Sequence, residues 1–334
     1  MEMESKNEEK IGTIQKELAC EVENFKAMIK KEPCVVYFGT DAGKIDNRED
    51  IELYIDALYQ GYLDACRTIH WKTDENNELL KRKKEWDKKA SHESTEKKNN
   101  PGREPLEQTA QEIKAYLENE DSIFEHKKWC TDLIEKYEKY IKGGITYGQA
   151  QKIINMAFKY LYCIYDRNGR LENKKDKFSE CHMPLDSFSL EWFKRSFKSE
   201  WKNYLGEKEK SKLPDYLFKN SGELKTDSIS SWSSMHSVEV VKEHDSYQRK
   251  KYPYEFYHNI IKKYCDEDLK KSISPLQLDF VVWDKMQKIM AAEDFIKAFA
   301  GKRNFACNDY HDITNLTPTL NERVDEIQRI LDKK

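Results

Sequence analysis

The segment QAQKIINMAFKYLYCIY (149–165) constrains the fold most, because apolar side chains cover most of its circumference when it is drawn as a helix. A helix that is apolar nearly all round cannot lie at a surface, so it is buried at the centre of a domain. The sequence therefore predicts a central helix over 148–165 with other elements packed around it. Its apolar residues, which cannot all face one neighbour, are Ile153, Ile154, Met156, Ala157, Phe158, Tyr160 and Leu161.

Four polar residues interrupt this apolar surface at helical spacing. Lys152, Asn155, Lys159 and Tyr162 lie at i, i+3, i+7 and i+10 and form a single stripe. An unpaired lysine inside a protein costs on the order of several kcal/mol. The stripe therefore needs acidic partners or faces a cleft. The alternative is that both lysines extend their methylene chains along the apolar surface and reach water beyond the helix ends.

The rest of the chain is typical of a mainly α, multi-helix globular fold. It has only 12 Gly and 8 Pro in 334 residues, and long stretches are rich in good helix formers. One short strand is expected near the N-terminus, at CVVYFGTD (34–41). Helices are predicted over 5–31, 48–71, 106–118, 121–141, 148–165, 188–205, 234–244, 253–265, 276–300 and 318–332.

Changes in composition divide the chain into three expected parts. An N-terminal helical segment with the short strand spans 1–72, and a helical domain carrying the candidate active site spans 106–334. Between them, 73–105 gathers nine Lys and Arg from 81 to 103 and ends in the turn-rich sequence NNPGREP. This middle part is predicted to be a charged linker or a solvated helix, with a basic loop that grips phosphates as the alternative.

Charge, hydropathy and cysteine use exclude several classes of protein. With 58 basic and 61 acidic side chains, the chain does not coat nucleic acid by bulk charge. No apolar run approaches the ~20 residues of a transmembrane helix, and the sequence begins without signal-peptide features. The eight cysteines include no CxxC pair, which suits reduced thiols rather than structural zinc. We therefore expect a soluble, cytoplasmic protein without membrane partners, metal or cofactor.

A proline-containing corner, CHMPLDS (181–187), opens a further predicted helix. Pro184 restricts Met183 to extended conformations, so Asp186 or Ser187 is placed to cap the helix that follows. Backbone N–H groups and the helix dipole would stabilise a carboxylate there. Most capping aspartates only cap. Asp186 is a candidate functional residue because it follows the lysine-bearing helix on a stiffened approach.

The elements GGITYGQAQKIINMAFKYL and HMPLDSFSLEWF together resemble the catalytic core of the helix-hairpin-helix DNA glycosylase superfamily. They are most similar to the branch typified by archaeal 8-oxoguanine DNA glycosylase. The shared order is a turn with glycine, a lysine inside a helix, a loop, and an apolar-Pro-apolar-Asp-Ser corner. The resemblance covers about residues 143–197. The family's turn usually holds two glycines one residue apart, whereas Gly148 stands alone here.

The resemblance implies a role for two residues. Lys152 would match the lysine that attacks the anomeric carbon and forms a Schiff base, and Asp186 the aspartate that supports departure of the base. Cleaving an N-glycosidic bond builds positive charge on the sugar, which a fixed carboxylate stabilises. An amine nucleophile needs a lowered pKa, which burial would provide. The partner would be DNA, with the target nucleotide flipped into a pocket.

Further polar and aromatic residues near these elements are candidates for substrate binding. Amides suit a base edge, rings suit stacking, and a cleft lined by His126, Lys152, His182 and Asp186 can be imagined. Two histidines and a carboxylate also suit a metal, although a partly exposed helix position is the simpler explanation for each histidine. The substrate-binding candidates are Gln149, Gln151, Asn155, Lys159, His182, Trp129 and Tyr147.

The predicted function is a DNA glycosylase, with or without lyase activity, that removes a damaged or modified base in repair or in defence against modified phage DNA. One alternative is a non-catalytic helical interaction module, in which the lysines bind internal acids and Asp186 only caps. Another is a nucleotide-binding sensor that uses the lysine stripe for phosphates. The segment 244–264 interleaves basic residues with tyrosines, which suits nucleic acid or an ordinary amphipathic helix.

Overall fold

A computed structural model describes residues 2–29, 50–70, 101–141, 144–206, 217, 219, 223–238 and 251–300. The expected strand at 34–41, most of the linker and the helix expected at 318–332 lie outside the described residues. The chain divides into two compact units, Met1–Val282 and Trp283–Lys334. Every residue of the candidate site belongs to the first unit.

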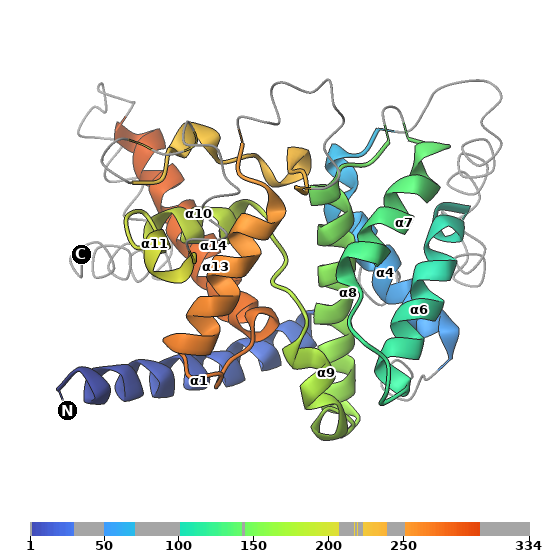
Figure 1. Cartoon of the computed structure of the whole chain (residues 1–334), viewed down its shortest axis with the longest axis horizontal. Coiled ribbons are helices and arrows are strands. Elements are labelled where there is room, and N and C mark those ends of the chain that lie inside the picture. Colours follow the sequence, from blue (N-terminus) through green and yellow to red (C-terminus); the bar gives the residue numbers. More distant parts are fainter. Residues whose placement is uncertain are drawn as a thin grey trace, which may run out of the picture. The chain divides into compact units, whose positions relative to one another are not determined.

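The predicted fold class is confirmed: the described residues form a mainly α structure with no sheet among them (Figure 1). No helix in this part of the chain has a stretch long and apolar enough to cross a membrane. The α-helices are α1 (Glu2–Ile29), α4 (Ile51–Ala65), α6 (Glu107–Glu118), α7 (His126–Glu138), α8 (Tyr147–Arg167), α9 (Lys175–Ser179), α10 (Ser187–Ser196), α11 (Trp201–Tyr204), α13 (Tyr254–Glu267) and α14 (Pro275–Ala300).

Helix α8 is the central helix that the sequence predicts. It lies against α4, α7, α1 and the short 3₁₀ helix η7 (Trp232–Ser234), and Figure 1 shows it upright beside α4 and α7. A capping box starts it, since the Thr146 side chain accepts from the Gln149 N–H while the Gln149 amide accepts from the Thr146 N–H. Ile153, Ile154 and Phe158 have no exposed surface.

Helices α4 and α8 pack closely because α4 carries Gly61 at the contact. A Cβ added to Gly61 would lie 2.3 Å from the carbonyl oxygen of Ile153. Only glycine allows the two backbones to come so near. The close approach brings Asp64, one turn further along α4, against α8, where its carboxylate accepts a hydrogen bond of 2.9 Å from the Tyr160 hydroxyl.

Two predicted helices differ from the structure because their backbone groups bond elsewhere. The helix expected at 188–205 is broken into α10 and α11, and the Lys198 carbonyl between them accepts from the Leu224 N–H at 3.0 Å. Residues 235–238, at the start of the helix expected over 234–244, are not helical. There the carbonyls of Met235 and His236 accept from backbone N–H groups of α8 and α13.

Candidate active site

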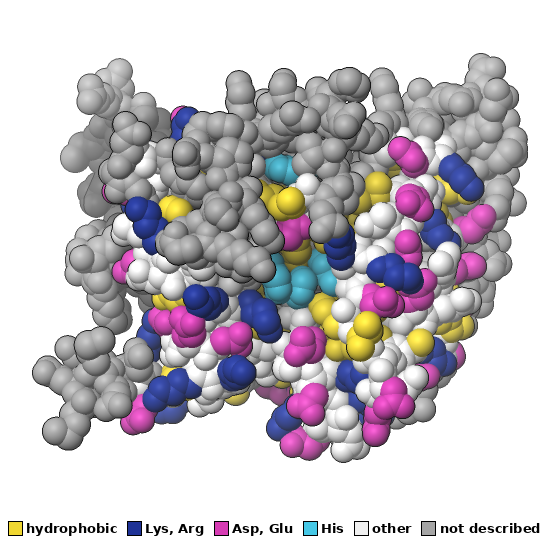
Figure 2. All heavy atoms as spheres, in the orientation of Figure 1, with side chains coloured by type: hydrophobic (Ala, Val, Ile, Leu, Met, Phe, Trp, Pro, Cys, Tyr) yellow, Lys and Arg dark blue, Asp and Glu magenta, His cyan; other side chains and the backbone are white. Residues whose placement is uncertain are grey.

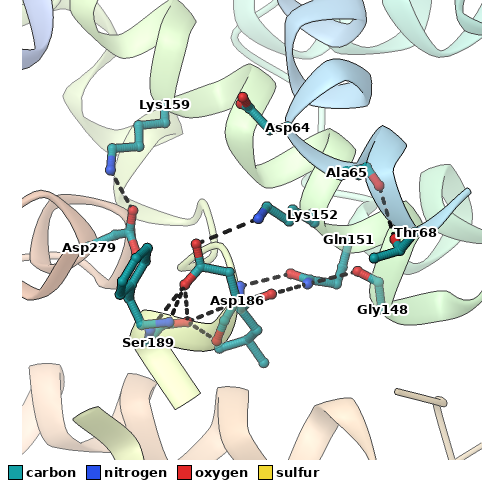
Figure 3. A network of polar contacts seen from close by, with 12 residues as sticks. Asp64, Ala65, Thr68, Gly148, Gln151, Lys152, Lys159, Asp186, Ser189 and Asp279 are labelled. Atoms are coloured by element: carbon teal, nitrogen blue, oxygen red, sulfur yellow. Dashed lines mark hydrogen bonds and ion pairs between the residues drawn. The ribbon is translucent and has the colours of Figure 1, made fainter. Parts of the chain in front are cut away.

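The structure brings Lys152 and Asp186 together from two elements. Lys152 projects from α8, and Asp186 is the N-cap residue of α10. The Lys152 Nζ lies 3.6 Å from Asp186 Oδ2, and the two side chains are 11% and 9% exposed (Figure 3). An amine and a carboxylate thus face each other in a largely desolvated place that keeps some access to solvent.

The other oxygen of Asp186 holds the start of α10. Oδ1 accepts from the backbone N–H groups of Phe188 at 2.9 Å and Ser189 at 3.1 Å, while the Ser189 hydroxyl accepts from the Asp186 N–H at 2.7 Å. This is the capping position that the sequence predicts. The carboxylate is therefore fixed through Oδ1 and presents Oδ2 to Lys152.

Gln151 and Asn155, both fully buried on α8, hold the corner that carries Asp186. The Gln151 amide accepts from the Leu185 N–H at 3.1 Å and donates to the Leu185 carbonyl at 2.8 Å. The Asn155 amide nitrogen lies 3.0 Å from Gln151 Oε1 and 3.2 Å from the Met183 carbonyl. The sequence analysis assigned both residues to substrate binding; here their amides position the Asp186 corner.

An aromatic ring covers the amine. Trp232, in η7, is half-buried, and the Lys152 Nζ lies 4.4 Å from the centre of its ring, a cation–π distance. Gly148 seats this turn on α8: its N–H donates to the Met235 carbonyl at 3.0 Å. An added Cβ at Gly148 would lie 1.7 Å from the Trp232 carbonyl oxygen. The lone glycine of the predicted hairpin thus positions Trp232.

Lys159, two turns further along the stripe, forms a closed ion pair. Its Nζ lies 2.6 Å from Asp279 Oδ2 of α14, with the two side chains 1% and 3% exposed. The ammonium also lies 4.7 Å and 4.6 Å from the ring centres of Phe25 and Phe280. Lys159 therefore has an acidic partner, as its place in a buried stripe predicts. The alternative that it reaches water is wrong for this residue.

Two further carboxyl groups, those of Asp64 and Asp279, have pKa values that depend on burial and on the charges of the stripe. Burial raises the pKa of Asp64 to about 6, although the Tyr160 hydroxyl and the Lys152 charge act in the opposite direction. Burial also raises the pKa of Asp279 to about 6; the charge of Lys159 opposes this and that of Asp186 adds to it. Burial thus disfavours the charged form of both carboxyls.

The remaining predicted site residues lie around α8. Gln149 donates to the Thr68 carbonyl at 2.7 Å in addition to its capping bond. Trp129 is 1% exposed and packs on Tyr116, Phe124 and Phe158 in an aromatic core. Tyr147 and His182 lie near Tyr254, with ring centres 5.2 Å and 6.0 Å from it. Their predicted substrate contacts stay predictions.

Sequence reasoning missed four residues of this region: Asp64, Trp232, His258 and Asp279. Each belongs to an element distant in sequence from 143–197, and none stands in a motif. Two of them had an available signal, because a buried lysine stripe requires carboxylates, and Asp64 and Asp279 are acids whose sequence neighbours are mostly apolar. Nothing in the sequence pointed to Trp232, whereas His258 lies within the segment 244–264, whose mixture of basic residues and tyrosines suits nucleic acid.

Comparison with known proteins found no match: no family model, no curated protein and no solved structure corresponds to the chain. Within the described residues, no three His, Cys, Asp or Glu side chains are grouped so that they could hold a metal ion. A function must therefore be inferred from the chemistry of these side chains.

Proposed function

We propose that the protein is a DNA N-glycosylase with lyase activity, in which Lys152 is the nucleophile and Asp186 stabilises the sugar cation. The observation that carries the proposal is the facing pair itself, an amine 3.6 Å from a fixed carboxylate with 11% and 9% of the two side chains exposed. The local resemblance of 143–197 to helix-hairpin-helix glycosylases agrees with this assignment of roles.

The chemistry is balanced with the groups present. As the C1′–N bond breaks, its electron pair leaves with the base, which takes up a proton, and positive charge develops on the sugar beside Asp186. The proton that the Lys152 ammonium loses passes through Asp186 Oδ2 to the departing base, and the free amine forms a new bond to C1′. As the bond between C1′ and O4′ breaks, O4′ takes up a second proton from the same nitrogen, and the sugar opens to a protonated imine.

Trp232 supports the same proposal. Its ring lies over the Lys152 amine and is half-buried, so it can contact a nucleotide that reaches the amine. Basic and acidic side chains are interspersed on the face shown in Figure 2. The expected DNA contact is therefore local, and weak at physiological salt.

One observation favours a second candidate, the non-catalytic interaction module. Lys159 and Asp279 form an ion pair whose side chains are almost completely buried. At least this part of the lysine stripe therefore has a structural role. If Lys152 and Asp186 did nothing more than this, the protein would bind neither DNA nor an aldehyde.

Borohydride trapping separates the two candidates. An oligonucleotide with one abasic site, and a panel with single damaged or modified bases, would be incubated with the protein and borohydride at low salt. We expect a covalent adduct that is lost in Lys152→Ala and retained in Lys128→Ala, which removes an exposed lysine of α7. Circular dichroism would show that both variants are folded. No adduct with the wild-type protein, or an unchanged adduct in Lys152→Ala, would overturn the proposal.

A further inference from the structure

Three histidines from three elements stack beside the candidate site. His126 begins α7, His182 lies in the corner before Asp186, and His258 is on α13. The ring centres are 4.2 Å apart for His126 and His182 and 3.5 Å apart for His182 and His258. His126 is buried, whereas His182 and His258 are half-buried. Figure 2 shows histidine side chains gathered in a recess near the middle of one face.

The hydrogen bonds of Tyr254 fix the state of His182. The Tyr254 hydroxyl lies 3.2 Å from the Asn155 amide nitrogen, which can only donate, and 2.9 Å from His182 Nδ1. Because the hydroxyl oxygen accepts from Asn155, its hydrogen is available to an unprotonated His182 Nδ1. A neutral His182 with this tautomer carries its proton on Nε2.

Burial keeps the three rings uncharged, and neighbouring positive charge adds to this effect at His182 and His258. Imidazolium ions at these spacings would repel one another, and Lys262 of α13 adds a positive charge that acts on both His182 and His258. Burial lowers the pKa of His126 and of His258 to about 3, and it lowers the pKa of His182 well below its usual value. No carboxylate contact offsets these effects among the hydrogen bonds of the three rings in the described structure.

Hydrogen-bonding groups are left over in the recess. Within the described part of the chain, His182 Nε2 and both ring nitrogens of His258 have no hydrogen-bond partner. The recess thus combines a flat aromatic surface with a directed N–H donor, both provided by imidazole rings that carry no charge. A neutral planar ring matches these properties, whereas a phosphate does not.

Helix α8 contacts the recess at Asn155, close to Lys152 on the same helix. Asn155, which bonds Tyr254 and accepts from His126 Nε2 at 2.9 Å, is three residues beyond Lys152, a rise of about 4.5 Å along the helix axis. A sugar held at Lys152 and Asp186 could therefore direct its base toward the histidines.

We propose that this recess binds the target nucleobase, which stacks on His258 and accepts a hydrogen bond from His182 Nε2. The inference rests on the proposed glycosylase function and deepens it: the substrate is a nucleotide whose base is uncharged and presents an acceptor at its edge.

Excision and trapping test this inference separately, because an abasic site has no base. For a base that the wild-type protein removes, we expect His258→Ala to slow single-turnover excision by ~10- to 100-fold. Trapping on the abasic oligonucleotide should stay within about twofold of wild type. His258→Phe, which keeps a flat ring, should recover part of the excision rate, and His70→Ala, at an exposed histidine, should change neither activity. Unchanged excision in His258→Ala, or an equal loss of trapping, would overturn the inference.

A titration with nucleosides keeps the inference testable if the glycosylase proposal fails. Adenosine, guanosine, cytidine and thymidine would be added to the wild-type protein while the imidazole signals are followed by NMR. We expect at least one nucleoside to shift the His182 and His258 signals and to leave those of His70 in place. Shifts with inorganic phosphate instead, or no shift with any nucleoside, would contradict a base-binding recess.

Discussion

Asp186 uses its two oxygens for different partners: Oδ1 accepts from the N–H groups of Phe188 and Ser189, and Oδ2 lies 3.6 Å from the Lys152 amine. The first set of contacts belongs to folding, because it starts α10. The second is the contact on which the proposed chemistry depends. The two tasks can be separated by mutation, because an asparagine caps a helix about as well as an aspartate but carries no charge.

Asp186→Asn is expected to separate stability from activity. The free energy of unfolding should fall less than in Asp186→Ala, because the asparagine keeps the helix cap. Adduct formation on abasic DNA should fall by ~100-fold, because an amide cannot accept the proton of the Lys152 amine as the carboxylate does. Urea denaturation and trapping rates measure the two effects. Asp186→Ala serves as the comparison and should lose stability as well. If Asp186→Asn formed the adduct at the wild-type rate, the proposed role of the carboxylate would be excluded.

The buried pair of Lys159 and Asp279 should show strong coupling. Lys159→Met alone leaves a buried carboxylate without its ammonium and should cost about 3 kcal/mol or more of unfolding free energy. The double variant Lys159→Met/Asp279→Leu should cost clearly less than the sum of the single changes. Lys175 and Glu172, an exposed pair, should contribute less than about 1 kcal/mol in the same double-mutant cycle. Additive effects at Lys159 and Asp279 would contradict a closed pair.

Two glycines in helices should respond oppositely to alanine. Gly61→Ala forces a Cβ against the Ile153 carbonyl, and the resulting shift of α4 should cost at least ~2 kcal/mol. Gly12 of α1 has nothing within 4 Å of an added Cβ, so Gly12→Ala should stabilise the protein by ~0.5–1 kcal/mol. Thermal denaturation of both variants measures these changes in stability. Unchanged stability of Gly61→Ala would contradict the close approach of α4 to α8.

Acid should destabilise the protein through its histidines. The pKa values of His126 and His258 are about 3 in the folded protein and about 6.5 when unfolded. The unfolded chain therefore binds protons first, and stability is lost as the pH falls from about 6.5 toward 3. Asp64 and Asp279, whose pKa values are raised to about 6, act in the opposite direction between about pH 4 and 6.

A variant isolates the histidine contribution from that of the carboxyls. His258→Phe should lose less stability than wild type between pH 7 and pH 5, by about 1 to 2 kcal/mol. Urea denaturation at both pH values gives the difference, and His70→Ala should behave like wild type because His70 is exposed. Equal losses in wild type and His258→Phe would show that His258 takes up a proton as easily in the folded state as in the unfolded one.

Much of the architecture could be predicted from the sequence because its signals are local. The apolar circumference of 148–165 identified the central helix, now α8 (Tyr147–Arg167), and Pro184 with Asp186 located the start of α10. Element ends were less predictable where the chain bonds to distant partners. The break between α10 and α11 and the non-helical 235–238 both follow from such tertiary backbone bonds.

The site was predictable only in part, because its other residues meet through tertiary packing. Lys152 and Asp186 stood out by their local settings. Asp279, Trp232 and His258 come from later elements, and no local pattern states which part of α8 they reach. The same limit explains Gln151 and Asn155: an amide next to a nucleophile suggests a substrate contact, but here tertiary contacts place the backbone of the corner against both side chains.

The Gln151 side-chain amide donates to the Leu185 carbonyl and accepts from the Leu185 N–H. The amide thus pairs with this backbone as a neighbouring β-strand would. These two hydrogen bonds hold the corner that carries Asp186 directly against α8, in addition to the chain connection from Arg167 to Cys181. The exposed residues of that connection, such as Glu172 and Lys175, should therefore tolerate substitution, whereas Leu171 and Phe178 are buried in the core. As long as the glutamine and the corner are kept, such changes leave the spacing of amine and carboxylate unaltered.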